Sequence, residues 1–263
     1  MGDHMKQDHL KAGLLLFGSY SFAVSVAKLL HELGHGIYVW LRGGAVYYNI
    51  NPFGTVYGTV SGDVNLDAFI YHWGGTISAT IIGLALLYVL KRQSSPYWGP
   101  VIMTGVVCVL FSGGNLLPGA IFDMIGDAGR LIALGTPRWV IFVVAVSLLI
   151  LGLYTAARWL VPLTGLGAQD SLRNYILVFL LGFAPYTAME ILYGVLRQHV
   201  WLRPVLFAVL TNVVVVLIAL VGKWYASWEK ASWPMRYGDI KRQHVISALL
   251  AGLFSVSFFI FVV

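Results

Sequence analysis

The chain has 263 residues, of which 59% are hydrophobic and 11% charged, and its mean hydropathy is +0.80. This composition excludes an ordinary water-soluble domain and favours a polytopic membrane protein, because each membrane helix needs roughly 20 apolar residues. The net charge of +6 does not indicate nucleic-acid binding. In membrane proteins, Lys and Arg concentrate in the loops on one side of the membrane and contact anionic lipid. The lone Cys108 excludes an internal disulfide and a cysteine-based zinc site.

The start of the chain predicts a tail, a long helix and a hairpin. Residues 1–9 are expected to form an N-terminal tail that begins with an expression scar, MGDHM. The first apolar run, from about Leu10 to Leu41, exceeds what a bilayer requires, so we expect a helix that tilts, extends into water or bends near Gly18. The stretch AVYYNINPFGTVYGTVSG then predicts two short β-strands around an Asn-Pro-Phe-Gly turn.

The rest of the chain predicts further membrane helices, for an all-α fold with about six or seven spans. A second span covers about residues 66–90, and its small-residue segment GGTISAT favours close helix packing. A third apolar run starts near Tyr97, and we expect Gly113, Gly114, Pro118 and Gly119 to interrupt it. The remaining spans are expected at about 139–157, 175–196, 205–221 and 245–263.

The first apolar run carries the motif HELGH at residues 31–35. A separation of four residues brings His31 and His35 to one helical face, about one turn apart, which suits two ligands of one tetrahedral zinc ion. Glu32 lies beside them and can act as a general base toward an activated water molecule. Ionisable groups within a membrane cost a few kcal/mol each, so this cluster indicates a shared function, binding a metal.

A catalytic zinc site has three protein ligands and leaves a fourth position to water, so a third ligand is required. The candidates are Asp123, Asp127, His72, His199 and His244. Asp127 lies in the segment GDAGRL, where Gly126 and Gly129 permit close backbone approach and the start of a new helix. Asp123 lies four residues earlier, and either acid could bind the metal while the other supports or caps.

These motifs resemble the site-2 protease family of intramembrane zinc metalloproteases. That family builds its active site from a His-Glu-x-x-His helix and an Asn-x-x-Pro…Asp-Gly segment, similar to HELGH and NLLPGAIFDMIGDAGRL here. In this chain Asp127 is followed by Ala128 rather than directly by glycine, which departs from the family pattern. The sequence context favours Asp127 as the third ligand, with Asp123 as the alternative.

The resemblance covers about the first 135 residues. We interpret residues 10–136 as a metalloprotease-like membrane core and residues 137–263 as additional transmembrane helices. It implies a zinc ion held by His31, His35 and one aspartate, with Glu32 activating water. It also implies that Asn115 positions the substrate or stabilises the developing oxyanion. The expected partners are a transmembrane protein substrate and the lipid bilayer, and the oligomeric state stays open.

The expected function is therefore hydrolysis of peptide bonds in membrane-embedded proteins, by an integral multi-pass protein of an unassigned membrane. Two alternatives remain: a zinc hydrolase acting on a lipid or small amide, and a non-catalytic scaffold or transporter whose metal is structural or lost. The orientation is also open. Lys and Arg lie mostly on the N-terminal side, which favours a cytoplasmic N-terminus and a metal site at the opposite face, whereas the resemblance implies a site toward the cytosol.

Overall fold

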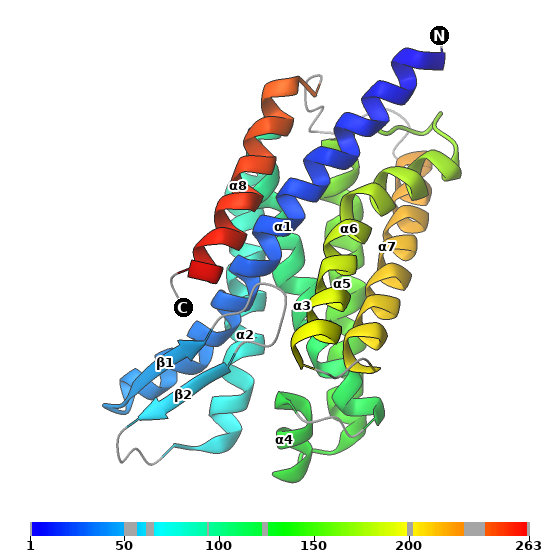
Figure 1. Cartoon of the computed structure of the whole chain (residues 1–263). Helices are drawn as coiled ribbons and strands as arrows, with labels where there is room; N and C mark the ends of the chain where they lie inside the picture. The colour runs from blue at the N-terminus through cyan, green and yellow to red at the C-terminus, as the bar shows by residue number, and fades with distance from the viewer. Residues whose placement is uncertain are drawn as a thin grey trace.

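The computed structural model describes residues 2–49, 57–61, 66–93, 95–122, 126–198, 202–228 and 240–261. Over these residues the chain is a helical bundle with one two-stranded antiparallel sheet after the first helix (Figure 1). Six described segments are long and apolar enough to cross a membrane: Gln7–Leu41, Ala68–Arg92, Pro96–Phe122, Arg138–Thr164, Leu172–Tyr193 and Val209–Trp228. The predicted all-α polytopic fold with a small hairpin is confirmed.

Helix α1 spans Gly2–Leu41 and contacts most of the other elements. The residues predicted as a tail are helical from Gly2 onward, and the helix continues through Gly18. A Cβ at Gly18 would lie 2.5 Å from the backbone of Ala248, so the absent side chain lets helix α8, Arg242–Phe261, pack directly against α1. Figure 1 shows these two helices side by side. Gly18 therefore allows α1 and α8 to cross at close range and does not interrupt α1.

The hairpin lies beside the C-terminal end of α1 (Figure 1). Its strands β1, Ala45–Asn49, and β2, Tyr57–Ser61, pair antiparallel with Tyr47 opposite Thr59. The hairpin is as the sequence predicts, while the Asn-Pro-Phe-Gly turn lies outside the described residues. Helix α2 begins close by, because its N-cap Asp67 donates its backbone N–H to Tyr38 Oη of α1 at 3.0 Å.

Helices α1 and α2 cross at glycines. Helix α2 spans Ala68–Val89 and is followed by the short 3-10 segments η1, Leu90–Arg92, and η2, Pro96–Trp98. A Cβ on Gly74 of α2 would lie 2.9 Å from the carbonyl oxygen of Gly34 of α1. The small residues thus bring the two backbones together, as the sequence predicts, and this places the second helix against the histidine-bearing turns of the first.

Helix α3 runs without interruption over Gly99–Phe122, so the predicted break at the glycines and Pro118 is wrong. These glycines lie where other helices come close: a Cβ on Gly113 would lie 2.8 Å from the carbonyl of Ala145 in helix α5, Arg138–Thr164. Gly119 likewise faces Ala128 of the short helix α4, Asp127–Ala133. Packing therefore overrides the local helix propensity, and the chain leaves α3 only after Phe122.

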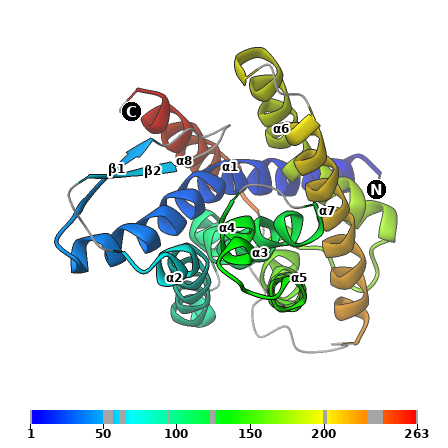
Figure 2. The ribbon, with the colours of Figure 1, turned by 90° about the horizontal axis from the view of Figure 1, so that it is seen from below.

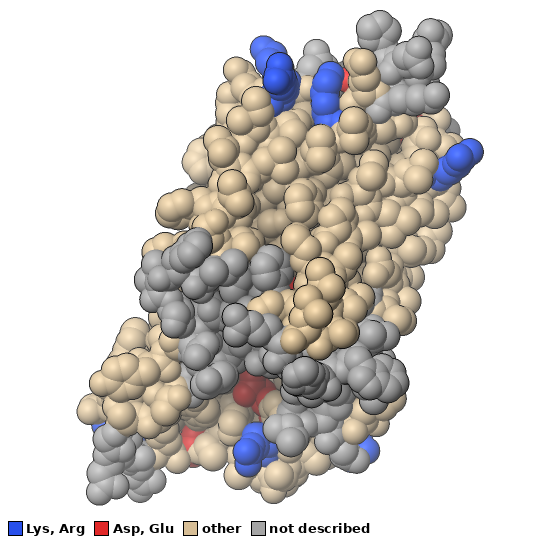
Figure 3. Space-filling view, viewed as in Figure 1, with Lys and Arg blue, Asp and Glu red and all other residues tan. Residues whose placement is uncertain are grey.

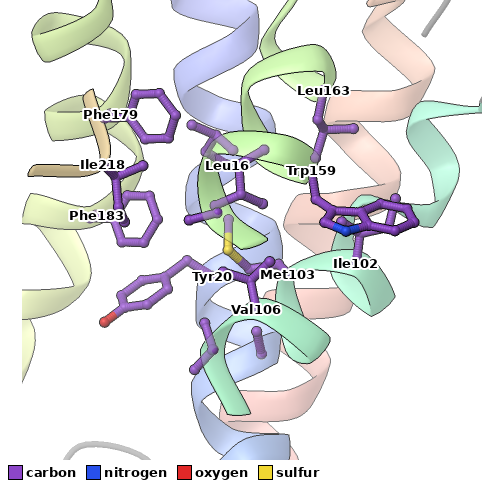
Figure 4. Packing of buried hydrophobic residues seen from close by; sticks show 14 of the residues in the cluster. Leu16, Tyr20, Ile102, Met103, Val106, Trp159, Leu163, Phe179, Phe183 and Ile218 are labelled. Atoms are coloured by element: carbon purple, nitrogen blue, oxygen red, sulfur yellow. The ribbon is translucent and has the colours of Figure 1, made fainter. Parts of the chain in front are cut away.

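The core of the bundle joins α1, α3 and α5 with helices α6, Leu172–Gln198, and α7, Leu202–Trp228 (Figure 4). Aromatic rings pack between α1 and α6, with the centroids of Tyr20 and Phe183 4.4 Å apart. On the face in Figure 3, Lys and Arg of the described residues lie toward the two ends, and the described residues between them form a broad band with almost no charge. Such a band is what a protein surrounded by lipid presents.

Candidate metal centre

The two histidines of HELGH point to one place. The Nε2 atoms of His31 and His35 are 3.3 Å apart, and both residues are buried. His35 Nδ1 donates to the carbonyl oxygen of Tyr71 in α2 at 2.6 Å. In the neutral form of His35 this hydrogen bond places the proton on Nδ1 and leaves the Nε2 lone pair directed at the site, the arrangement that metal-binding histidines use. The edge of the His31 ring packs against Phe111 of α3, with centroids 5.5 Å apart.

Asp127 joins them from a distant part of the chain. It is the first residue of α4, and Gly126 before it has φ +148° and ψ −173°, a conformation largely restricted to glycine. Seen from below in Figure 2, α4 lies across the end of α3 near α2 and α5. Asp127 Oδ2 is consequently 3.0 Å from His31 Nε2 and 3.4 Å from His35 Nε2. The three atoms form a compact triangle.

Two further side chains hold the Asp127 carboxylate. His72 Nδ1 lies 3.1 Å from Oδ1, and the Asn115 amide donates to Oδ2 at 3.5 Å. Oδ1 is thus occupied by a protein partner while Oδ2 faces the two imidazoles, so the carboxylate would bind a metal through one oxygen. Partners of this kind orient metal ligands and raise the affinity of the site.

The Asp127 carboxylate is also kept ionised. Burial alone would raise its pKa, but hydrogen bonds with His31, His35 and His72 outweigh burial, and the pKa lies well below its usual range. Placement in the first turn of α4 adds the favourable dipole of a helix N-terminus. A deprotonated carboxylate is the form that binds metal.

A glycine of α2 keeps space open above the imidazoles. A Cβ on Gly75 would lie 2.5 Å from His35 Nε2 and 2.7 Å from His31 Nε2. Any larger residue would place carbon within reach of both lone pairs. The sequence GGTISAT thus has two roles: Gly74 permits the helix crossing, and Gly75 leaves room at the ligand atoms.

Glu32 completes the group. One carboxylate oxygen of Glu32 and one ring nitrogen from each of His31 and His35 lie within 4.8 Å of one another, and this cluster could hold a metal ion. Neutral imidazoles and carboxylates are common ligands of divalent transition metals. The residues brought together are thus His31, Glu32, His35, His72, Asn115 and Asp127, all singled out by the sequence, with His72 contacting Asp127.

The other candidates lie elsewhere or are not described. Asp123 and His199 fall outside the described residues. His244 lies at the start of α8, at the opposite end of the bundle from α4, with its ring 4.4 Å from that of Tyr97. Glu190 of α6, an acidic residue within an apolar span, forms an ion pair with Lys28 of α1 at 3.1 Å. That contact joins α6 to α1 one turn before His31.

No protein-family model, no curated protein and no solved structure matches the chain. The class is therefore defined by the fold and the site alone: a helical multi-pass membrane architecture with a buried His-Glu-His group able to hold a metal ion.

Proposed function

We propose that the protein is an intramembrane zinc metalloendopeptidase of the site-2 protease kind, which hydrolyses peptide bonds of membrane-embedded proteins. The supporting observation is the triangle formed by His31 Nε2, His35 Nε2 and Asp127 Oδ2, with edges of 3.0, 3.3 and 3.4 Å. Zinc–ligand bonds of 2.0–2.1 Å in a tetrahedron give edges of about 3.3–3.4 Å. The triangle therefore has the size of one face of a zinc coordination tetrahedron.

The identity of the donors also favours a catalytic zinc ion. Two imidazoles and one carboxylate form the three-ligand set of hydrolytic zinc sites, which leave a fourth position open. When bound, zinc would polarise the scissile carbonyl and lower the pKa of a water molecule. Placing these ligands about a metal also explains why two imidazole nitrogens and a carboxylate oxygen crowd together in a buried region, because a divalent cation offsets the cost of their desolvation.

The chain's own groups would then perform the proton transfers. Glu32 takes the proton of the attacking water, whose oxygen bonds to the carbonyl carbon, and it returns the proton to the amide nitrogen as the C–N bond breaks. His72 keeps Asp127 oriented throughout. The Asn115 amide, beside Asp127 Oδ2, supplies a donor near the developing oxyanion.

The hairpin offers a means of holding the substrate. A transmembrane substrate must unwind locally, because the hydrogen bonds of a helix shield its carbonyls. Within the described residues each strand of the hairpin pairs along one edge only. An unwound substrate segment can add to such an edge as a further strand, with its carbonyls extended and accessible.

The decisive experiment compares two purified variants in liposomes with a single-span model substrate. Glu32→Gln should retain one zinc per chain, measured by elemental analysis, and lose cleavage. His31→Ala should lose both. The matched control is Asp8→Asn, a carboxylate-to-amide change at an exposed position of the same helix, which should cleave at the wild-type rate.

Other outcomes point to the alternatives. Hydrolysis of lipid amides together with an intact protein substrate would replace the endopeptidase with a lipid or small-amide hydrolase. Stoichiometric zinc without any hydrolysis would contradict the proposed function and favour a structural metal. Activity that survives Glu32→Gln would contradict the role of Glu32 as general base.

A further inference from the structure

A tyrosine of the hairpin reaches the helix face that carries Glu32. Residues of β1 alternate between two faces, so Tyr47 and Tyr48 point in opposite directions. Tyr47 is 68% exposed, whereas the hydroxyl oxygen of Tyr48 is buried. That hydroxyl lies over Gly36 of α1, in the space that a side chain there would fill.

Gly36 and Glu32 are four residues apart on α1 and share one helical face. Tyr48 is therefore held about one turn from the carboxylate that we propose as general base. The pKa of Tyr48 is consistent with this position. Burial raises it most, and the negative charge of Glu32 raises it further. A phenol with a raised pKa stays protonated at neutral pH and remains a hydrogen-bond donor.

The Tyr48 hydroxyl has no hydrogen-bond partner among the described residues. Other tyrosines of the chain differ: Tyr38 Oη accepts from the backbone of Asp67, and Tyr175 Oη donates to the carbonyl of Gly167. A buried hydroxyl without a partner costs free energy, and such groups call for a functional explanation.

We propose, on the basis of the endopeptidase function above, that Tyr48 is a further catalytic residue, whose hydroxyl donates a hydrogen bond to the scissile carbonyl oxygen as it gains negative charge. The strand that binds the unwound substrate then also supplies a donor to the reaction. Tyr48 and Asn115 approach from different elements, the hairpin and α3, and together they would form an oxyanion-stabilising pair.

The test is Tyr48→Phe, which removes only the hydroxyl, with Tyr88→Phe at an exposed position near the end of α2 as the matched control. Tyr48→Phe should lower kcat by about 100- to 1,000-fold, the usual cost of losing one such donor, while changing KM less than about twofold. Zinc content and the acid limb of the pH–rate profile should match those of the wild type, because the ligands and Glu32 are unchanged. Tyr88→Phe should cleave at the wild-type rate.

Several results would overturn the assignment. Equal kcat in Tyr48→Phe and wild type would refute it while leaving the endopeptidase proposal intact. Loss of zinc, or a shifted acid limb, would instead make Tyr48 a support for the ligands or for Glu32. Wild-type protein that binds zinc but cleaves no protein substrate would remove the proposed function, and the role of Tyr48 with it.

Discussion

Gly75→Ala tests the metal centre without changing any ligand. The added methyl carbon would lie 2.5 Å from His35 Nε2 and 2.7 Å from His31 Nε2. Non-bonded carbon contacts are comfortable only at about 3.5–4.0 Å, so the rings or the helix must move by about 1 Å. Metal–ligand distances tolerate deviations of only about 0.2 Å, so the imidazoles cannot retain both the methyl and the metal.

We therefore expect zinc affinity to fall by at least about 10- to 100-fold, the range found when the support of metal ligands is disturbed. In free energy this is about 1.4–2.8 kcal/mol. Competition with a chromophoric zinc chelator in detergent measures it directly. The matched control is Gly114→Ala in α3, where a Cβ meets nothing within 4 Å, and its zinc affinity should equal that of the wild type.

If Gly75→Ala binds zinc weakly, thermal unfolding in excess chelator shows whether the cause lies at the metal site or in the stability of the fold. A metal-free melting temperature close to that of the wild type locates the defect at the metal. Wild-type zinc affinity in a folded Gly75→Ala protein would refute the reasoning, because the metal would then lie away from the space above the two Nε2 atoms.

Three other changes have defined outcomes. His72→Ala should weaken zinc binding by about 10- to 100-fold by releasing Oδ1 of Asp127, and unaltered affinity in the same titration would show that His72 does not support the ligand. Lys28→Met should lower the free energy of unfolding by about 1–3 kcal/mol in denaturant titrations, because it removes a partner of Glu190. The double variant Lys28→Met, Glu190→Leu should lose less stability than the sum of the two single variants, and strict additivity would contradict a coupled pair. Gly126→Ala should lower the free energy of unfolding by about 1–3 kcal/mol through backbone strain alone, because its Cβ meets nothing within 4 Å. It should also speed hydrogen exchange in α4, and unchanged exchange would argue against a strained turn.

The sequence predicts those parts of the site that depend on local spacing. The four-residue separation of His31 and His35 on a helix determines their common face, and the alternation of apolar and turn residues determines the hairpin. The continuity of the third helix cannot be predicted from the sequence alone. Considered by themselves, its glycines and Pro118 predict an interrupted helix. Gly113 and Gly119 instead allow α5 and α4 to pack closely, and such contacts are not visible in a linear pattern.

The choice between the two aspartates also depends on tertiary structure. Asp127 reaches the histidines because α4 starts after the turn at Gly126 and packs against α2 and α3, which the linear sequence does not show. The role of Gly75 has the same origin. A small residue in a membrane helix indicates close packing, and only the neighbouring imidazoles reveal that the space belongs to a ligand site.

The length of α1 has a consequence for where bonds would be cut. From Gln7, where the first apolar span begins, to His31 the helix rises about 36 Å, or about 34 Å when tilted by 20°. A hydrocarbon layer is about 30 Å thick. A helix that enters this layer at Gln7 therefore carries the imidazoles just past its far boundary. Under the proposed function, bulk water would then reach the site without a pore, and a target protein would be severed near the rim of its own membrane anchor.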